Sequence, residues 1–236
     1  MSLAKRFANL DTLSRSAADQ LAMLASASKG TCHVALSGGS TPKRMFQVLA
    51  ERGKKFLPWE RVELWWGDER CVPPDHPDSN YGMTRANLID PLGLDPAKVH
   101  RIAGERDPDE AAADYERQLV SALGTPPVFD LVLLGMGPDG HTASLFPGSA
   151  GLTETKRYVI ANRVDSPLTK GPATRITLTF PAINAAKHVR FLVAGADKAE
   201  TLVGVLQGPP GVYPSQLVAS ADLAWFVDDA AAGKLG

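Results

Sequence analysis

Phe129-Asp-Leu-Val-Leu-Leu-Gly-Met-Gly-Pro-Asp-Gly-His-Thr-Ala-Ser-Leu-Phe-Pro147 is the stretch that most clearly indicates the fold, because an apolar run meets a glycine-rich turn there. An apolar run bounded by glycine is typical of a buried strand in a parallel sheet. Open α/β folds bind their ligands beyond the carboxyl ends of such strands. The turn places Asp139 and His141 at that position, and a histidine exchanges protons near neutral pH. The segment therefore predicts an α/β fold and the location of a site.

Two other interpretations of this turn need to be weighed. Its glycines (Gly135, Gly137 and Gly140) match the G-x-G-x-x-G pattern of dinucleotide-binding proteins. That pattern requires a crossover helix after the third glycine and an acidic residue at the end of the next strand. Here Pro147 interrupts any helix, and the next predicted strand ends in Asn162, so a nicotinamide or flavin site is disfavoured. The other alternative, a histidine that only stabilises the turn, is disfavoured by the adjacent acid and the strand end.

Composition and charge exclude several classes of protein. The chain has 236 residues, of which 44% are hydrophobic and 22% charged, and its formal net charge is −1. These values predict one globular domain over residues 1–236, without a field that would attract nucleic acid or a membrane. Cys32 and Cys71 are too few for a disulfide framework, and no run approaches the ~20 apolar residues of a membrane span. We expect a soluble, cytoplasmic monomer or weak homo-oligomer.

The order of predicted elements defines the fold class. Apolar runs predict strands at 32–36, 62–66, 99–102, 130–134, 158–162, 175–179, 188–194 and 223–227. Amphipathic or capped segments predict helices at 11–28, 42–52, 81–89, 108–122 and 197–206. The alternation predicts an α/β fold with a mostly parallel, doubly wound sheet and helices on both faces. Alternating apolar and polar residues place the 175–179 strand at an edge.

Polar residues follow the first two of these strands. Ser37-Gly-Gly-Ser-Thr-Pro42 leads into a helix whose predicted first residue is Pro42 after an N-cap at Thr41. The free N–H groups at a helix start favour a phosphate or carboxylate, although a loop that only caps the helix is the alternative. Gly67-Asp-Glu-Arg70 follows the next strand, and Arg70 is suited to clamp an anionic oxygen. If this segment is extended, Asp68 and Glu69 point in opposite directions, so only one faces a site.

Further candidates lie near other strand ends. Lys198, in Gly195-Ala-Asp-Lys198, falls in the predicted first helical turn, where a cation opposes the helix dipole unless an anion binds beside it. Arg175 opens a predicted strand, and Asn80 either lines a pocket or caps a helix. Cationic groups, one histidine and few acids suit a small phosphorylated substrate and proton transfer with water. The sequence has no metal-ligand spacing, so we expect no metal site.

Four blocks of this sequence resemble one known family. They are Ser37–Pro42, Gly67–Arg70 with Ser79-Asn-Tyr81, Leu134–Pro147, and Arg175-Ile-Thr-Leu-Thr with Gly195–Lys198. In this order they resemble the 6-phosphogluconolactonases of the glucosamine-6-phosphate isomerase/6-phosphogluconolactonase family, from about Ala35 to Val227. The resemblance implies a fold like those of glucosamine-6-phosphate deaminase and ribose-5-phosphate isomerase. It also implies hydrolysis of 6-phospho-D-glucono-1,5-lactone, in the oxidative pentose phosphate pathway, without any cofactor.

For this reaction we hypothesise roles for individual residues. His141 would take a proton from the attacking water, and Asp139 or a backbone group would fix the His141 tautomer. Arg70 would polarise the lactone carbonyl or stabilise the developing oxyanion. The predicted substrate-binding residues are Gly38, Gly39, Ser40, Thr41, Asp68, Asn80, Gly137, Arg175 and Lys198. Segment 165–174 departs from the family's usual Pro- and Lys-rich stretch, so the resemblance assigns no contact to Lys170. An isomerase or deaminase acting on a sugar phosphate, and a non-catalytic sugar-phosphate-binding protein, are the alternatives.

Overall fold

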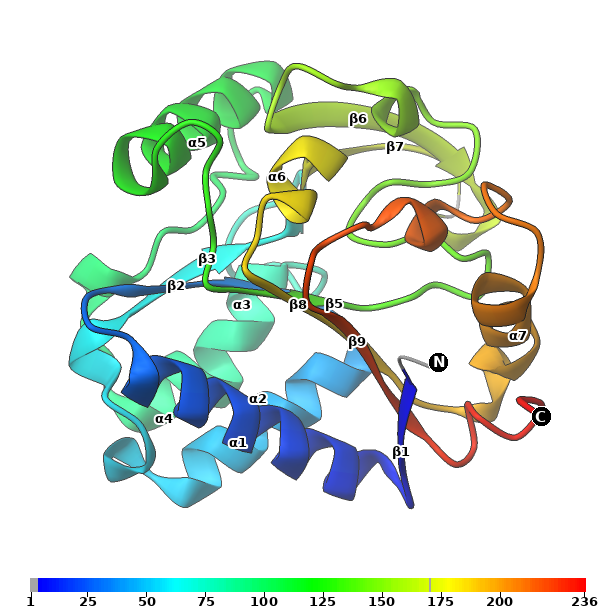
Figure 1. Ribbon diagram of the computed structural model, residues 1–236. Coiled ribbons are helices and arrows are strands. Elements are labelled where there is room, and N and C mark those ends of the chain that lie inside the picture. The colour runs from blue at the N-terminus through cyan, green and yellow to red at the C-terminus, as the bar shows by residue number, and fades with distance from the viewer. Residues whose placement is uncertain (1–3, 170) are drawn as a thin grey trace.

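The computed structural model describes residues 4–169 and 171–236, and within them the fold is built on a six-stranded sheet (Figure 1). Its strands are β1 (Ala4–Phe7), β2 (Cys32–Leu36), β3 (Val62–Trp66), β5 (Leu131–Leu134), β8 (His188–Val193) and β9 (Leu223–Asp228). They lie in the order β1-β9-β8-β5-β2-β3, and every neighbouring pair is parallel. The predicted α/β class and parallel sheet are therefore confirmed.

The central strands form where apolar residues run without interruption. All four residues of β5 are buried, as are four of the five residues in each of β2 and β3. Both faces of such strands are covered, which removes the alternation seen in half-exposed strands. The predicted bounds of β2 and β3 are confirmed to the residue. β1 was missed because its sequence, Ala-Lys-Arg-Phe, is polar at the centre and lies at the sheet's edge.

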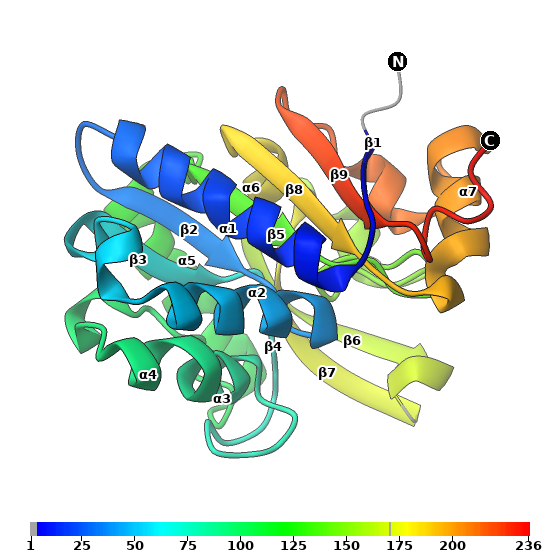
Figure 2. The ribbon, with the colours of Figure 1, turned by 90° about the horizontal axis from the view of Figure 1, so that it is seen from below.

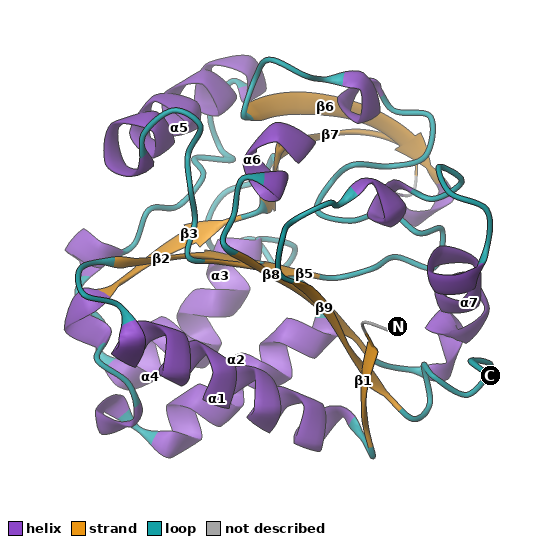
Figure 3. Cartoon of the chain, in the orientation of Figure 1, coloured by secondary structure: helices purple, strands orange, loops and turns teal. Residues whose placement is uncertain are grey.

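Two layers cover the faces of the sheet (Figures 2 and 3). One layer holds α1 (Leu10–Ala27), α2 (Ser40–Arg52) and α3 (Asn80–Thr84), which continues through a π-helical segment, Arg85–Ile89, into α4 (Asp90–Leu92). The opposite layer holds α5 (Pro108–Leu123), α6 (Phe180–Asn184) and a small antiparallel sheet, while α7 (Ala199–Gln207) follows β8. Among the described helices, none is long and apolar enough to cross a membrane.

The small sheet is the part of the fold that differs most from expectation. It consists of β4 (Asp68–Arg70), β6 (Val159–Ser166) and β7 (Gly171–Leu178), in the order β4-β7-β6. The prediction that residues 175–179 form an edge strand is wrong, because β7 pairs with a strand on each side. The alternation does not mark exposure, since Thr177 and Thr179 are as fully buried as Ile176 and Leu178.

Three local predictions are also corrected. Residues 99–102 were predicted to form a strand, but in this described stretch only Val99 bridges Leu64 of β3. α2 begins at Ser40 with Gly39 as its N-cap, two residues before the predicted start at Pro42. α7 begins at Ala199 because residues 196–198 form a separate 3-10 turn. Other 3-10 turns lie at Lys54–Phe56, Trp59–Arg61, Pro96–Lys98, Ala150–Thr153, Pro167–Thr169 and Pro214–Leu217.

Candidate active site

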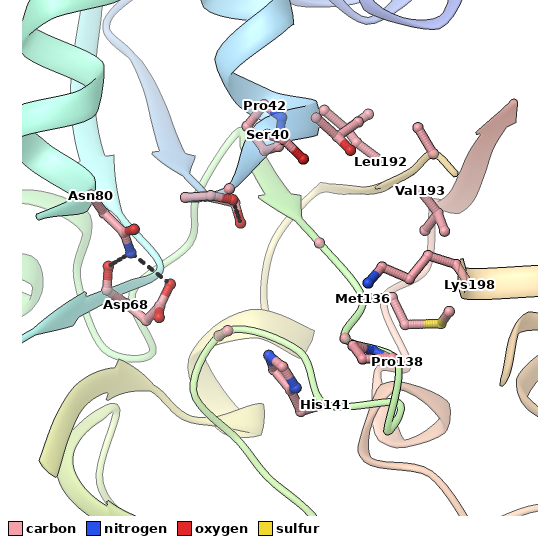
Figure 4. A pocket seen from close by; sticks show the side chains of 18 of the residues that line it. Ser40, Pro42, Asp68, Asn80, Met136, Pro138, His141, Leu192, Val193 and Lys198 are labelled. Carbon is pink, nitrogen blue, oxygen red and sulfur yellow. Dashed lines mark hydrogen bonds between the residues drawn. The ribbon is translucent and has the colours of Figure 1, made fainter. Parts of the chain in front are cut away.

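A cavity of about 290 Å³ lies where the carboxyl ends of β8, β5, β2 and β3 meet (Figure 4). These four strands are neighbours in the sheet, so the loops that follow them border one space. The predicted site residues that line it are Gly38, Gly39, Ser40, Thr41, Asp68, Arg70, Asn80, Gly137, His141 and Lys198. The sheet therefore brings together segments that lie up to 160 positions apart in the sequence (198 − 38 = 160).

The start of α2 forms the first wall of the cavity. Gly39 is its N-cap with φ of +100°, a conformation that favours glycine, and no described side chain caps this helix end. The first N–H groups of a helix have no partner within the helix, and the dipole gives this end a partial positive charge. Ser40 and Thr41 add hydroxyl groups beside them. This wall is suited to bind a phosphate.

Lys198 adds a positive charge at the cavity. Its ammonium lies 2.8 Å from the Asp197 carboxylate, and its side chain is 21% exposed. Figure 4 shows the side chain reaching toward the centre of the cavity from the end of β8. Lys198 does not lie inside the first turn of α7 as predicted, because it ends the 3-10 turn that precedes this helix. An anion between Lys198 and the start of α2 would contact positive groups on two sides.

His141 and Asp139 form a hydrogen-bonded pair on the turn after β5. The His141 Nδ1 atom lies 2.6 Å from Asp139 Oδ1, which also accepts the backbone N–H of His141 at 3.1 Å. Burial acts to raise the pKa of Asp139, but its hydrogen bond and charge interaction with His141 hold it below the usual value. A carboxylate at Nδ1 keeps the proton on that nitrogen and leaves Nε2 as the basic atom. Asp139 supports His141, although it is not among the described cavity-lining residues.

Two further contacts hold the imidazole of His141 in place. The ring stacks on Phe146 with centroids 4.1 Å apart and planes 20° apart. The pair also packs directly on Gly137, where a Cβ atom would lie 2.1 Å from His141 Nδ1 and 2.7 Å from Asp139 Oδ1. Any residue larger than glycine would therefore displace the pair. The prediction that Gly137 belongs to the site is explained by this close packing.

Arg70 lines the cavity beside the end of β3, whereas Arg175 does not line the described part of it. The two arginines are register partners on β4 and β7. The Arg70 guanidinium donates to the Asp78 carbonyl, which fixes one end of the fork. Burial, followed by the nearby charge of Arg70, lowers the pKa of Arg175. Arg70 is thus placed to contact a ligand, and Arg175 lies next to it.

Asp68 is anchored by groups from two other segments. Its Oδ2 accepts the Ser144 hydroxyl at 2.7 Å. Its Oδ1 accepts Asn80 Nδ2 at 3.3 Å (Figure 4). Asn80 Nδ2 also donates to the Asp68 carbonyl at 2.9 Å. Asn80 is not the N-cap of α3, since Ser79 holds that position. Gly38 makes room for this amide, because a Cβ atom there would lie 1.8 Å from Asn80 Oδ1.

Several residues of the site were not predicted from the sequence. Ser144 lies within the Leu134–Pro147 block, and its closeness in sequence to His141 was the signal that could have found it. Its hydrogen bond to Asp68 joins residues 76 positions apart, so the local sequence does not indicate that bond. Ser144 does not itself line the cavity, and the unpredicted residues that do line it are Ser37, Pro42, Gly135, Met136, Pro138, Ala143, Leu168, Leu192, Val193 and Ala194. Those up to Ala143 lie within the Ser37–Pro42 and Leu134–Pro147 blocks, which was the signal that could have found them. The last four are apolar, and nothing in the local sequence distinguishes them from core residues. Lys170 lies outside the described residues.

Metal and nucleotide chemistry find little support in the described residues. Within 4–169 and 171–236, no group of three or more His, Cys, Asp or Glu side chains is arranged to hold a metal ion. Between Gly140 and β6, the described chain forms only the 3-10 turn Ala150–Thr153 and no crossover helix. A dinucleotide site of the G-x-G-x-x-G type needs that helix.

Comparisons with known proteins agree with this geometry. The model of the family "Glucosamine-6-phosphate isomerases/6-phosphogluconolactonase" matches residues 8–225. A 6-phosphogluconolactonase of Synechocystis sp. is 40% identical over 217 residues, which are 89% of this chain and 87% of that protein. One from Streptomyces coelicolor is 39% identical over 224 residues, covering 89% and 85% of the two chains.

Solved structures give the same result. The 6-phosphogluconolactonase from Trypanosoma cruzi has a TM-score of 0.87 and 31% identity, covering 100% of this chain and 98% of that chain. A monomeric glucosamine-6-phosphate deaminase has a TM-score of 0.85 at 22% identity, covering 99% and 100%, which shows a shared fold.

The fold and the cavity define an α/β protein with a polar, phosphate-suited site at the carboxyl edge of a parallel sheet. Within that class, the chain belongs to the glucosamine-6-phosphate isomerase/6-phosphogluconolactonase family.

Proposed function

We propose that this protein hydrolyses 6-phospho-D-glucono-1,5-lactone to 6-phosphogluconate, using water activated by His141. The observation that carries the proposal is that His141, held by its hydrogen bond to Asp139, and the uncapped start of α2 border one cavity. A phosphorylated sugar lactone has an anionic group at one end and an ester at the other. Family membership supports the same substrate, since relatives about 40% identical bear the name 6-phosphogluconolactonase.

The phosphate would bind at the start of α2. The N–H groups of the first helical turn and the hydroxyls of Ser40 and Thr41 would donate to its oxygens, and Lys198 would supply a full charge. Arg175 remains a predicted contributor of positive charge, acting from beside Arg70. With the phosphate fixed, the ring ester would extend toward His141 and Arg70.

Hydrolysis then requires a base, an attacking water and a stabilised oxyanion. His141 Nε2 would take a proton from water as the oxygen attacks the lactone carbonyl carbon. The carbonyl π electrons would move to oxygen, and Arg70 would stabilise the resulting negative charge. When the carbonyl re-forms, the ring C–O bond breaks and the departing ring oxygen takes the proton from His141. The carboxylic acid product loses its own proton to water, so no cofactor is consumed.

Asp139 and Asp68 would have supporting roles. Asp139 would hold the His141 tautomer and stabilise the imidazolium that forms during attack. Asp68 and Asn80 would contact sugar hydroxyl groups, since both line the cavity and each restrains the other. We also propose that the enzyme works in the cytoplasm as a monomer or weak homo-oligomer.

A lactone-hydrolysis assay, corrected for spontaneous hydrolysis, tests the proposal. The wild-type protein is expected to accelerate lactone loss. Because a general base contributes about 10²–10⁴-fold, we expect His141→Ala to lower kcat by a factor in this range. Circular dichroism and the melting temperature would verify that the variant folds. A folded His141→Ala variant with wild-type kcat would show that His141 is not the base.

Isomerase or deaminase chemistry is the main alternative, because Asp68 places a carboxylate at the end of β3. Its two oxygens accept bonds from Ser144 and Asn80, which limits its availability as a base. Incubation with glucosamine 6-phosphate distinguishes the two reactions, because a deaminase would release ammonia. Binding of 6-phosphogluconate without any lactone turnover would instead indicate a non-catalytic sugar-phosphate-binding protein.

A further inference from the structure

Glu69 is a buried carboxylate that the proposed reaction does not use. It lies on β4 between Asp68 and Arg70, which both line the cavity, but it is itself only 2% exposed. Successive side chains of a strand point to opposite sides, so Glu69 projects behind the cavity wall. Burial raises the pKa of Glu69, even though backbone N–H groups of Tyr81, Asn80 and Arg70 act in the opposite direction. An isolated carboxylate in this position would be costly, so its bonds need to be accounted for.

Four donors surround the Glu69 carboxylate. Its Oε1 accepts the backbone N–H of Arg70 at 2.8 Å and that of Asn80 at 2.7 Å. Its Oε2 accepts the backbone N–H of Tyr81 at 2.8 Å and the Ser79 hydroxyl at 3.1 Å. Oε1 therefore joins two segments 10 positions apart (80 − 70 = 10), and both segments carry a cavity-lining side chain.

The connection extends across the cavity wall. Asn80 follows the N-cap of α3, so the carboxylate binds N–H groups that have no partner within the helix. The Asn80 side chain in turn holds Asp68 and packs on Gly38, at the start of the predicted phosphate loop. A shift of the helix start relative to β4 would move Asn80 away from Arg70 and Asp68. Within residues 4–169 and 171–236, Glu69 is the one side chain that binds the backbone N–H groups of both Arg70 and Asn80.

We propose that Glu69 is a positioning residue, which holds Arg70 and Asn80 at the separation that one substrate molecule requires. It touches no substrate and acts through these two residues. The inference rests on the proposed lactone hydrolysis, because the readout is the turnover of that substrate. A carboxylate is required because it has only acceptors, whereas an amide would present its own hydrogens to two of the donors.

The test is Glu69→Gln, measured with 6-phosphogluconolactone and corrected for spontaneous hydrolysis. Small displacements of substrate-positioning groups cost up to about 100-fold in rate, so we expect kcat/KM to fall by about 10- to 100-fold. The matched control is Asp130→Asn. Asp130 also accepts a backbone N–H, that of His33 at 2.8 Å, but it lies at the amino end of β5, away from the cavity. Both variants are expected to melt at a lower temperature, and only Glu69→Gln is expected to lose kcat/KM.

A double-variant comparison separates positioning from general damage. In the Arg70→Ala/Asn80→Ala background, Glu69→Gln should lower kcat/KM by less than about twofold, because interacting residues are not additive. An equal fall in both backgrounds, or wild-type kcat/KM in folded Glu69→Gln, would overturn the proposal. If Glu69→Gln does not fold, Ser79→Ala removes one donor to Glu69 together with the N-cap bond to the Gly82 N–H, and unchanged kcat/KM in that variant would overturn the proposal as well. Failure of the proposed function has a different signature, since the wild-type protein itself would then not turn over lactone.

Discussion

Replacement of Asp139 by asparagine tests the mechanism at its central hydrogen bond. In the wild-type protein, Asp139 Oδ1 lies 2.6 Å from His141 Nδ1, and the two side chains are 28% and 21% exposed. The carboxylate accepts the Nδ1 proton and leaves Nε2 free to act as a base. Asparagine has nearly the same shape but no charge, and its amide can donate to Nδ1 and so favour the tautomer with the proton on Nε2. Asp139→Asn therefore changes the chemistry of His141 with little change in volume.

The size of the effect follows from the strength of this bond. Hydrogen bonds to charged groups contribute about 1.5–3 kcal/mol. Each 1.36 kcal/mol corresponds to a tenfold change in rate, so kcat should fall by about 10- to 150-fold if the bond stabilises the transition state. KM should stay within about twofold, because the pair makes no contact with the bound phosphate in the proposed arrangement. The lowered pKa of Asp139 keeps the carboxylate ionised throughout the neutral range, so the charge that the substitution removes is present at every pH of the assay.

The assay is steady-state lactone hydrolysis at several pH values, with spontaneous hydrolysis subtracted. The chain offers a matched control in a second histidine–carboxylate pair, His188 Nδ1 and Asp222 Oδ2, which are 2.5 Å apart. His188 opens β8 at the amino end of the sheet, opposite the cavity. Asp222→Asn should leave kcat unchanged. Equal kcat in wild-type and Asp139→Asn protein would refute the role of Asp139, whatever the result for His141→Ala.

Three other changes have expected outcomes. Gly38→Ala places a Cβ atom 1.8 Å from Asn80 Oδ1, so the free energy of unfolding should fall by about 1–3 kcal/mol and kcat/KM should also fall; chemical denaturation and kinetics would show both. Lys198→Ala should raise KM by about 10- to 150-fold with kcat retained, since a charged hydrogen bond to phosphate is lost; a change in kcat alone would contradict this. Burial lowers the pKa of His33, whose Nδ1 accepts from Trp65 Nε1 at 3.2 Å, so the unfolded chain binds more protons in acid. The contribution of His33 to stability should be complete above pH ~6.5 and decrease as the pH falls. Melting temperatures measured at several pH values should therefore fall more steeply with decreasing pH in the wild-type protein than in His33→Gln.

Much of the central sheet was predictable because its strands are short, apolar and continuous. β2 and β3 form over the predicted residues, since burial on both faces selects for uninterrupted apolar runs. The small sheet was predicted less well. β4 has the sequence Asp-Glu-Arg, and it becomes a strand because Asp68–Arg70 pair with residues 175–177 of β7. Such non-local pairing leaves no periodic pattern in the sequence around it.

The candidate site also consists of parts that the local sequence predicts and parts that depend on distant residues. The sequence by itself determined the local parts: the glycine-rich turns after the strands, the presence of a helix after the Ser37–Gly39 loop, and the Asp139-Gly-His141 spacing that closes a hydrogen bond within one turn. The exact start of that helix, two residues before the predicted one, was not determined. Only the tertiary structure decided which of these parts face one another. Strand order places β8, β5, β2 and β3 side by side, so the turns that follow them border one cavity. The packing also put Arg70, but not its register partner Arg175, in the cavity lining, and it paired Asp68 with Ser144. The physical reason is that backbone turns and caps depend on neighbouring residues, whereas the approach of distant side chains depends on how the whole sheet packs.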